Sequence, residues 1–173
     1  MTKAALPAMP AFFDRYINLA PDFDLLDALR QTATIDNLID RNTLDALGDQ
    51  RYAPGKWTMR DIVQHLIDTE RIMTYRALRI ARADQTPLPG FDENSFAELA
   101  DASHRSLADL CTEYAELRRS TLQLFGSFTN EMLLRSGTAS DKTISVLALG
   151  FVLVGHPMHH ANIVRERYVP LLG

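Results

Sequence analysis

The stretch ISVLALGFVLVGHPMHHANIVRERY, residues 144–168, contains the most apolar run of the chain and three of its five histidines. Residues four apart lie one above the other on a helix face, so His156 and His160 would meet the same neighbours. At about 100° per residue, the apolar stripe of such a helix includes this pair. It runs through Leu149, Val152, Leu153, His156, His160 and Ile163. The segment therefore predicts an inward-facing helix that carries two imidazoles.

Two imidazoles at this spacing can bind one metal ion, as they do in helical zinc motifs. The alternative is a pair of core histidines, each satisfied by one hydrogen bond, which is the usual state of buried polar groups. His159 lies beside the stripe and is a second candidate ligand. Pro157 lies between the paired histidines and cannot bond the Leu153 carbonyl, so we expect either a kink or a new helix there.

A third histidine lies in the stretch TMRDIVQHLIDTERIMTYRALRIARA, residues 58–83. Thr58 and Asp61 resemble a capping box, which predicts a long helix that ends near Ala83. His65 is next to the apolar stripe in the second turn of this helix. If the helix packs antiparallel to residues 144–168, all three histidines lie at one level. This coincidence favours a shared metal site over separate core histidines.

Two further long helices are predicted, over Asp24–Arg41 and from Ser106 to Gly126. We expect short helical pieces between them and no confident strand, with RSGTASDKT, residues 135–143, as a polar loop. Four long helices predict an all-α fold, a four-helix bundle with its site in the core. Residues 1–173 are expected to form a single domain, in which residues 1–21 are a loosely packed N-terminal arm with Phe12, Phe13 and Tyr16 as possible anchors.

The composition excludes several classes of protein. A net charge of -4 offers no basic surface for nucleic acid. The single cysteine, Cys111, excludes an internal disulfide and a cysteine-cluster metal site. We see no signal peptide, and the apolar run is about half the length that spans a bilayer. We therefore expect a cytoplasmic protein without nucleic-acid or membrane partners.

Three segments taken together resemble the DinB-like family. They are GKWTMRDIVQHLIDTERIMTYRALRIAR (55–82), TPLPGFDE (86–93) and GHPMHHANIVRERY (155–168). The resemblance implies an up-down-down-up four-helix bundle, often a homodimer. The family's three-histidine motif falls on His65, His156 and His160, which would hold a divalent ion, nickel or zinc. Pro157 departs from the family pattern, which has a helix former at that position.

The resemblance further implies a metal-dependent enzyme with an open metal position. Its reaction would be transfer to or from a small thiol, or hydrolysis of a small-molecule substrate. The alternative is a non-catalytic metal-binding or dimerising helical bundle related to stress.

Several charged residues near the site are candidates for auxiliary roles. Glu70 could act as a base near the metal, or could form a salt bridge with Arg165 or Arg167. Asp61 or Asp68 could orient His65, although solvated acids on a helix face are the more common case. One arginine near the end of the 58–83 helix could hold an anionic substrate, while the others are surface charges. These arginines are Arg71, Arg76, Arg79 and Arg82.

Overall fold

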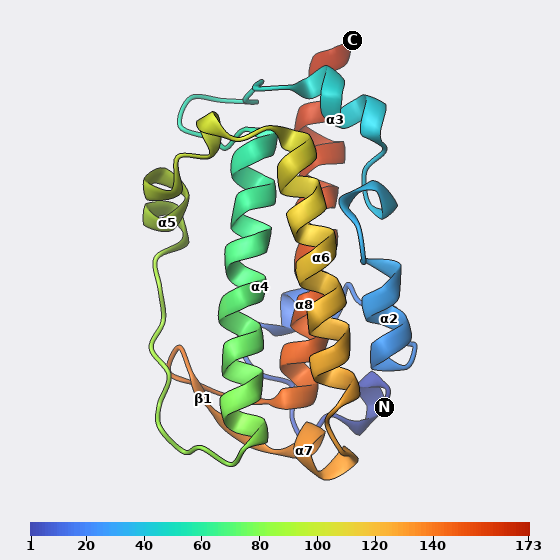
Figure 1. The fold of residues 1–173 in the computed structure, drawn as a ribbon, viewed down its shortest axis with the longest axis vertical. Coiled ribbons are helices and arrows are strands. Elements are labelled where there is room, and N and C mark those ends of the chain that lie inside the picture. Colours follow the sequence, from blue (N-terminus) through green and yellow to red (C-terminus); the bar gives the residue numbers. More distant parts are fainter.

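Four helical rods run side by side in the computed structural model, which describes residues 1–173 (Figure 1). The rods are α2 (Leu25–Gln31) with α3 (Arg41–Leu47), then α4 (Met59–Ala81), α6 (Leu107–Gly126) and α8 (Val146–Ile163). In the view of Figure 1 the first rod rises, α4 and α6 descend, and α8 rises again. The predicted four-helix bundle with up-down-down-up order is therefore confirmed.

The first rod is broken, whereas the sequence predicted one helix from Asp24 to Arg41. After α2 ends, the Thr34 side chain accepts the Asn37 N–H and starts a 3-10 turn. The Asp40 side chain then accepts the Thr43 N–H and opens α3. Such local bonds from hydroxyl and carboxylate side chains compete with a continuous helix. This competition explains the break.

Capping side chains open α4, α6, α7 and α8, and those of α4 and α6 lie at the predicted positions. Thr58 and Asp61 form a reciprocal capping box at the start of α4. Ser106 caps α6, and Thr129 caps the short helix α7 (Asn130–Leu134). Ser145 caps α8. Each of these side chains satisfies a backbone N–H that the first turn leaves without a partner, which fixes where the helix begins.

A β-hairpin stands where the sequence predicted a polar loop. Strands β1 (Ser136–Ala139) and β2 (Lys142–Ser145) pair antiparallel, with Ala139 opposite Lys142. Ser140 and Asp141 form the turn at φ angles of 50° and 58°. Turns of this kind are usually marked by Asn-Gly or Asp-Gly, and here the signal is absent because the turn is Ser-Asp. The prediction of no strand was therefore wrong at this position.

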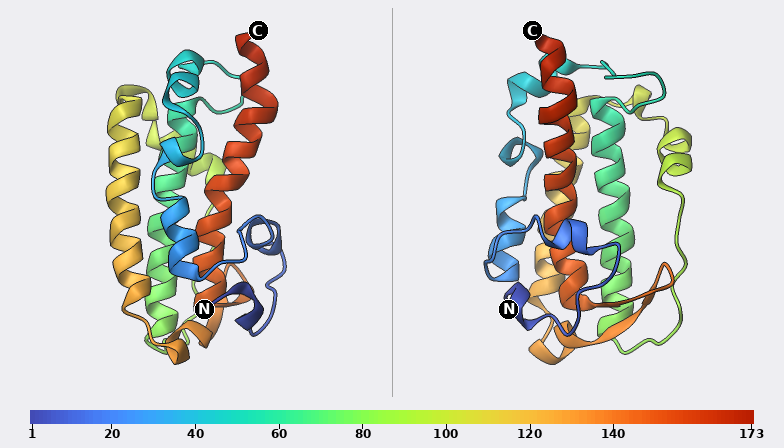
Figure 2. Two further views of the ribbon diagram at one scale, coloured as in Figure 1. Left: turned by 90° about the vertical axis from the view of Figure 1, so that its right-hand side faces the viewer. Right: turned by 180° about the vertical axis from the view of Figure 1, so that it is seen from behind.

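The N-terminal segment packs closely against α8, so the prediction of a loose arm was wrong. It contains the short helix α1 (Asp14–Ile17), and the side chains of Phe13, Tyr16 and Ile17 are buried. The right-hand view of Figure 2 shows this blue segment lying across α8. A Cβ on Gly155 would lie 1.8 Å from the Tyr16 carbonyl oxygen, so only glycine allows this approach. The contact brings α1 to the turn of α8 that carries His156.

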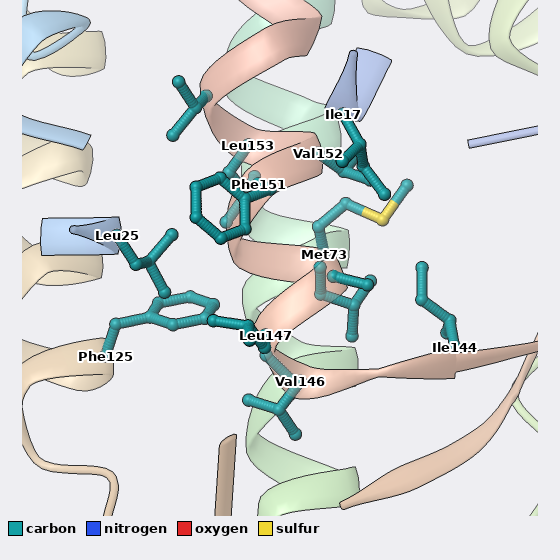
Figure 3. Packing of buried hydrophobic residues seen from close by; sticks show 14 of the residues in the cluster. Ile17, Leu25, Met73, Phe125, Ile144, Val146, Leu147, Phe151, Val152 and Leu153 are labelled. Atoms are coloured by element: carbon teal, nitrogen blue, oxygen red, sulfur yellow. The ribbon is translucent and has the colours of Figure 1, made fainter. Parts of the chain in front are cut away.

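Helix α8 is the centre of the core because it is apolar on all sides and buried over most of its length. Figure 3 shows Leu147 and Phe151 of α8 near Leu25 of α2 and Phe125 of α6. The loop after α4 runs along the outside of the bundle to α5 (Glu93–Ala100), as Figure 1 shows. No helix of the structure has both the length and the apolar character needed to cross a membrane.

Candidate metal centre

The three predicted histidines lie together in the interior. His65 Nε2 is 3.0 Å from His156 Nε2, which in turn is 3.1 Å from His160 Nε2. The potential ligand atoms of all three lie within 4.8 Å of one another. His65 comes from the second turn of α4, and the other two come from consecutive turns of α8. The antiparallel packing of these helices thus places the imidazoles at one level.

The arrangement of the nitrogens suits a divalent cation. A neutral imidazole has one N–H and one ring lone pair, so His156 Nε2 cannot form good hydrogen bonds to both neighbours at once. A central cation would instead accept a lone pair from each ring. Nitrogens bound to a tetrahedral zinc ion are about 3.3 Å apart, close to the separations found here. The donor set therefore fits a metal ion better than it fits mutual hydrogen bonds.

Burial keeps these histidines in the neutral state that a metal requires. Burial lowers the pKa of His65 to about 4. It also lowers the pKa of His160 to about 3, with smaller contributions from neighbouring imidazoles. The pKa of His156 is shifted well below its ordinary value for the same reasons. At neutral pH all three rings can therefore offer a lone pair.

Aromatic side chains frame the cluster. The Trp57 ring packs against His65 with centroids 4.7 Å apart and stacks on His160 at 6.0 Å. Tyr16 packs edge-on against His156 at 5.1 Å. The Tyr168 hydroxyl donates to the Trp57 carbonyl at 2.6 Å, which ties this frame to the end of the chain. Sequence reasoning did not assign Trp57 to the site because an aromatic residue at a helix start is typical of core packing.

Other side chains considered from the sequence lie elsewhere. His159 is half-buried outside the cluster and packs edge-on against Tyr16 at 5.4 Å. Asp61 accepts the Thr58 backbone N–H, and Asp68 accepts a bond from Gln64. Neither carboxylate is bonded to His65, whose ring instead contacts His156, so the suggestion that one of these acids orients His65 was wrong.

Glu70 faces α6 rather than the histidines. Arg118 pairs with its carboxylate at 2.8 Å, and the two side chains are only 1% and 2% exposed. The Thr121 hydroxyl donates to the same carboxylate at 2.6 Å. The predictions of a base near the metal and of a salt bridge with Arg165 or Arg167 were therefore wrong. The sequence offered no local signal for a partner that lies 48 residues away.

Arg118 also explains how α8 tolerates a proline between two histidines. The helix continues across Pro157 to Ile163, so the alternative of a new helix was wrong. The missing N–H leaves the Leu153 carbonyl without its helical partner. Arg118 Nη2 donates to that carbonyl at 2.9 Å. An arginine of α6 thus replaces the bond that the proline removes, one turn before His160.

Two cavities open beside the cluster. One, of about 250 Å³, is lined by His160, Trp57 and the cations Arg15 and Lys56. The other, of about 200 Å³, is lined by residues that include His156, Thr69 and Arg76. Tyr16 and Glu93 line both. A small molecule can therefore approach the histidines from either side, which leaves room for an open metal position.

Comparison with known proteins agrees with this geometry. The model of the DinB superfamily matches residues 25–164. A Bacillus pumilus protein is 26% identical over 144 residues, covering 82% of this chain and 81% of its own. YfiT of Bacillus subtilis is 29% identical over 126 residues, covering 70% of each chain. Both relatives carry the name "Putative metal-dependent hydrolase".

The solved structure of YfiT is described as having an unusual four-helix bundle topology. It matches this chain with a TM-score of 0.69 at 21% identity, over 92% of this chain and 87% of its own. This likeness shows that the two chains share the bundle fold.

Proposed function

The chain belongs to the DinB superfamily, and from this premise we propose that it is a metal-dependent hydrolase with a three-histidine centre. The observation that carries the proposal is the convergence of three buried Nε2 atoms from α4 and α8. The names of the relatives support hydrolysis as the reaction. Three imidazoles suit zinc or nickel among the common divalent ions.

When bound, a divalent ion with three protein ligands and an open position supplies Lewis acidity and lowers the pKa of a water molecule. The chain's own residues supply orientation and proton transfer. Trp57 and Tyr16 fix the imidazole rings by packing against them. Glu93 lines both cavities and forms no ion pair with a basic side chain, so it takes the role of general base that Glu70 cannot fill.

Metal analysis of protein purified without a histidine tag tests the centre. Wild type should retain zinc or nickel in stoichiometric amount, and His156→Ala and His160→Ala should lose it. His159→Ala is the matched control because this residue is adjacent in sequence but outside the cluster. Metal retained in full by His156→Ala and His160→Ala would contradict the proposal and favour a non-catalytic bundle.

Hydrolysis of a panel of small activated esters and amides tests the reaction. Activity should vanish after chelation and return when zinc or nickel is added. Glu93→Gln should lower turnover while metal content stays unchanged. Turnover that occurs only when a small thiol is added would contradict hydrolysis and indicate thiol transfer instead.

A further inference from the structure

Arg76 differs from the other arginines in the second half of α4. Arg71 pairs with Glu113, and Arg79 pairs with Asp84. Arg82 is exposed at the end of the helix. Arg76 alone among them is buried, with 2% of its surface exposed. A buried guanidinium is rare unless it is paired with an acid or bound to a ligand.

No acid compensates the charge of Arg76. Its Nη2 donates to the Pro89 carbonyl at 2.6 Å and to the Ser140 hydroxyl at 3.0 Å. Its Nη1 contacts the Met73 sulfur at 3.5 Å, which is a weak acceptor. The ion pairs of the chain do not include this residue. Burial lowers its pKa, yet a guanidinium stays protonated at neutral pH, so a buried positive charge remains without a counter-ion.

Thr69 provides a second unsatisfied group on the same helix face. It is 4% exposed, and its hydroxyl is the only buried side-chain polar atom without a hydrogen-bond partner. It lies one turn after His65 and two turns before Arg76, a spacing that places all three on one side of α4. Thr69 and Arg76 both line the cavity of about 200 Å³ that also reaches His156.

The rest of this cavity indicates the kind of anion that it takes. Its walls include the apolar side chains of Phe13, Met73, Phe91 and Val152. A single guanidinium matches a single negative charge, and its planar fork suits a carboxylate. Glu93, which also lines the cavity, disfavours a second negative charge on the ligand. A small monocarboxylate with an apolar body therefore fits this site better than a phosphate ester does.

We propose that Arg76 binds the carboxylate of a small apolar acid in the cavity beside His156, and that the Thr69 hydroxyl becomes a second donor when its side chain turns toward the cavity. The other end of the ligand then points toward the histidine cluster. This makes the ligand a carboxylate-bearing substrate or its product, an inference that rests on the proposed hydrolase. The binding of the carboxylate does not require the metal. The two proposals can therefore fail separately.

Isothermal titration of the metal-free protein tests the site. The probes are acetate, benzoate, phenylacetate and hexanoate, each compared with its neutral amide, and inorganic phosphate as the competing anion. At least one carboxylate should bind saturably, and its amide should not. Arg76→Met should weaken this binding roughly 10- to 100-fold, as expected for the loss of a charge-assisted hydrogen bond. Thr69→Val keeps the shape of the side chain and should weaken it roughly 3- to 10-fold.

Arg79→Met is the matched control, because it removes a positive charge three residues away that is already paired with Asp84. It should leave the affinity unchanged. Four outcomes would overturn the proposal. They are binding that needs added metal, binding that Arg76→Met leaves intact, preference for inorganic phosphate over every carboxylate, and no binding of any probe. Circular dichroism of each variant confirms that lost binding does not reflect lost folding.

Discussion

Two buried arginines on neighbouring helices differ in whether an acidic side chain compensates their charge. Arg118 on α6 bonds to Glu70, to the Thr32 and Tyr114 hydroxyls and to the Leu153 carbonyl. Arg76 on α4 has a carbonyl, a hydroxyl and a sulfur as hydrogen-bond partners, lies 5.9 Å from the centroid of the Phe91 ring, and borders a cavity. Their exposed fractions are nearly equal, at 1% and 2%. Burial therefore does not distinguish them, whereas the presence of a counter-ion does.

The presence or absence of a counter-ion distinguishes buried polar groups that stabilise the fold from buried polar groups that are available to bind a ligand. Arg118 connects α4, α6 and α8 in a closed polar cluster, in which its charge is paired with the Glu70 carboxylate. Arg76, Thr69 and the three histidines form an open set. Arg76 has no counter-ion, the Thr69 hydroxyl has no hydrogen-bond partner, and His156 Nε2 cannot satisfy both neighbouring imidazoles at once. Buried polar groups are normally satisfied, so an unsatisfied set that borders a cavity indicates function.

The largest effect is expected for Arg118→Met. This variant leaves the Glu70 carboxylate buried without its cation, and breaking a buried pair in this way costs about 3–5 kcal/mol. Urea unfolding monitored by circular dichroism measures the loss. Arg119→Met is the control, because its side chain is exposed one residue away and should change stability by less than about 0.5 kcal/mol. A small loss for Arg118→Met would remove the contrast between the two arginines.

Acid should destabilise the metal-free protein through the open set. The folded-state pKa values of His65 and His160, about 4 and about 3, lie below the unfolded value near 6.5. Between these values the unfolded chain binds more protons, so stability falls as pH decreases from about 6.5. Each of the two histidines should cost about 2 kcal/mol by pH 5, so together they should cost about 4 kcal/mol. Urea unfolding of the chelated protein at several pH values measures this slope.

The control for the acid effect is the double variant that carries both His65→Gln and His160→Gln, measured without metal. It lacks the two titrating groups and should show a much shallower slope over the same pH range. An equal slope in this variant would assign the acid sensitivity to other groups.

Local signals in the sequence were sufficient for the outline of the fold and for the three histidines. The capping side chains Thr58 and Ser106 act on backbone groups within the first turn of their helices, so sequence spacing reveals them. The His156 and His160 pair is likewise defined by the helical repeat. The hairpin escaped prediction because its Ser140-Asp141 turn adopts positive φ without the usual glycine.

Long-range partners could not be predicted in the same way. Glu70 and Arg118 are chosen by the packing of α4 on α6, and no periodicity within either helix encodes that pairing. The sequence identified four arginines on α4 as candidates for an anion, but it could not choose among them. That choice depends on burial and on the position of Ser140 and Pro89, which reach Arg76 from other elements.

A smaller effect is expected for Pro157→Ala, and it tests whether Arg118 acts on the helix between the histidines. Alanine restores the N–H that bonds the Leu153 carbonyl, so the carbonyl no longer depends on Arg118. Pro157→Ala should therefore increase the free energy of unfolding by about 1 kcal/mol more in the Arg118→Met background than in wild type. A double-mutant cycle from urea unfolding measures this coupling. A coupling energy near zero would show that the bond from Arg118 to the Leu153 carbonyl does not contribute to stability.

The smallest effect on stability is expected for Arg76→Met, and its smallness is the informative result. Removing a buried charge without a counter-ion relieves a desolvation cost, while losing its bonds to Pro89 and Ser140 opposes this gain. The two terms should leave the free energy of unfolding within about 1 kcal/mol of wild type, or above it. Arg76→Gln retains a donor for the same two acceptors and should behave similarly. If both variants were destabilised as strongly as Arg118→Met, Arg76 would be a structural residue. The main evidence that the neighbouring cavity binds a ligand would then be removed.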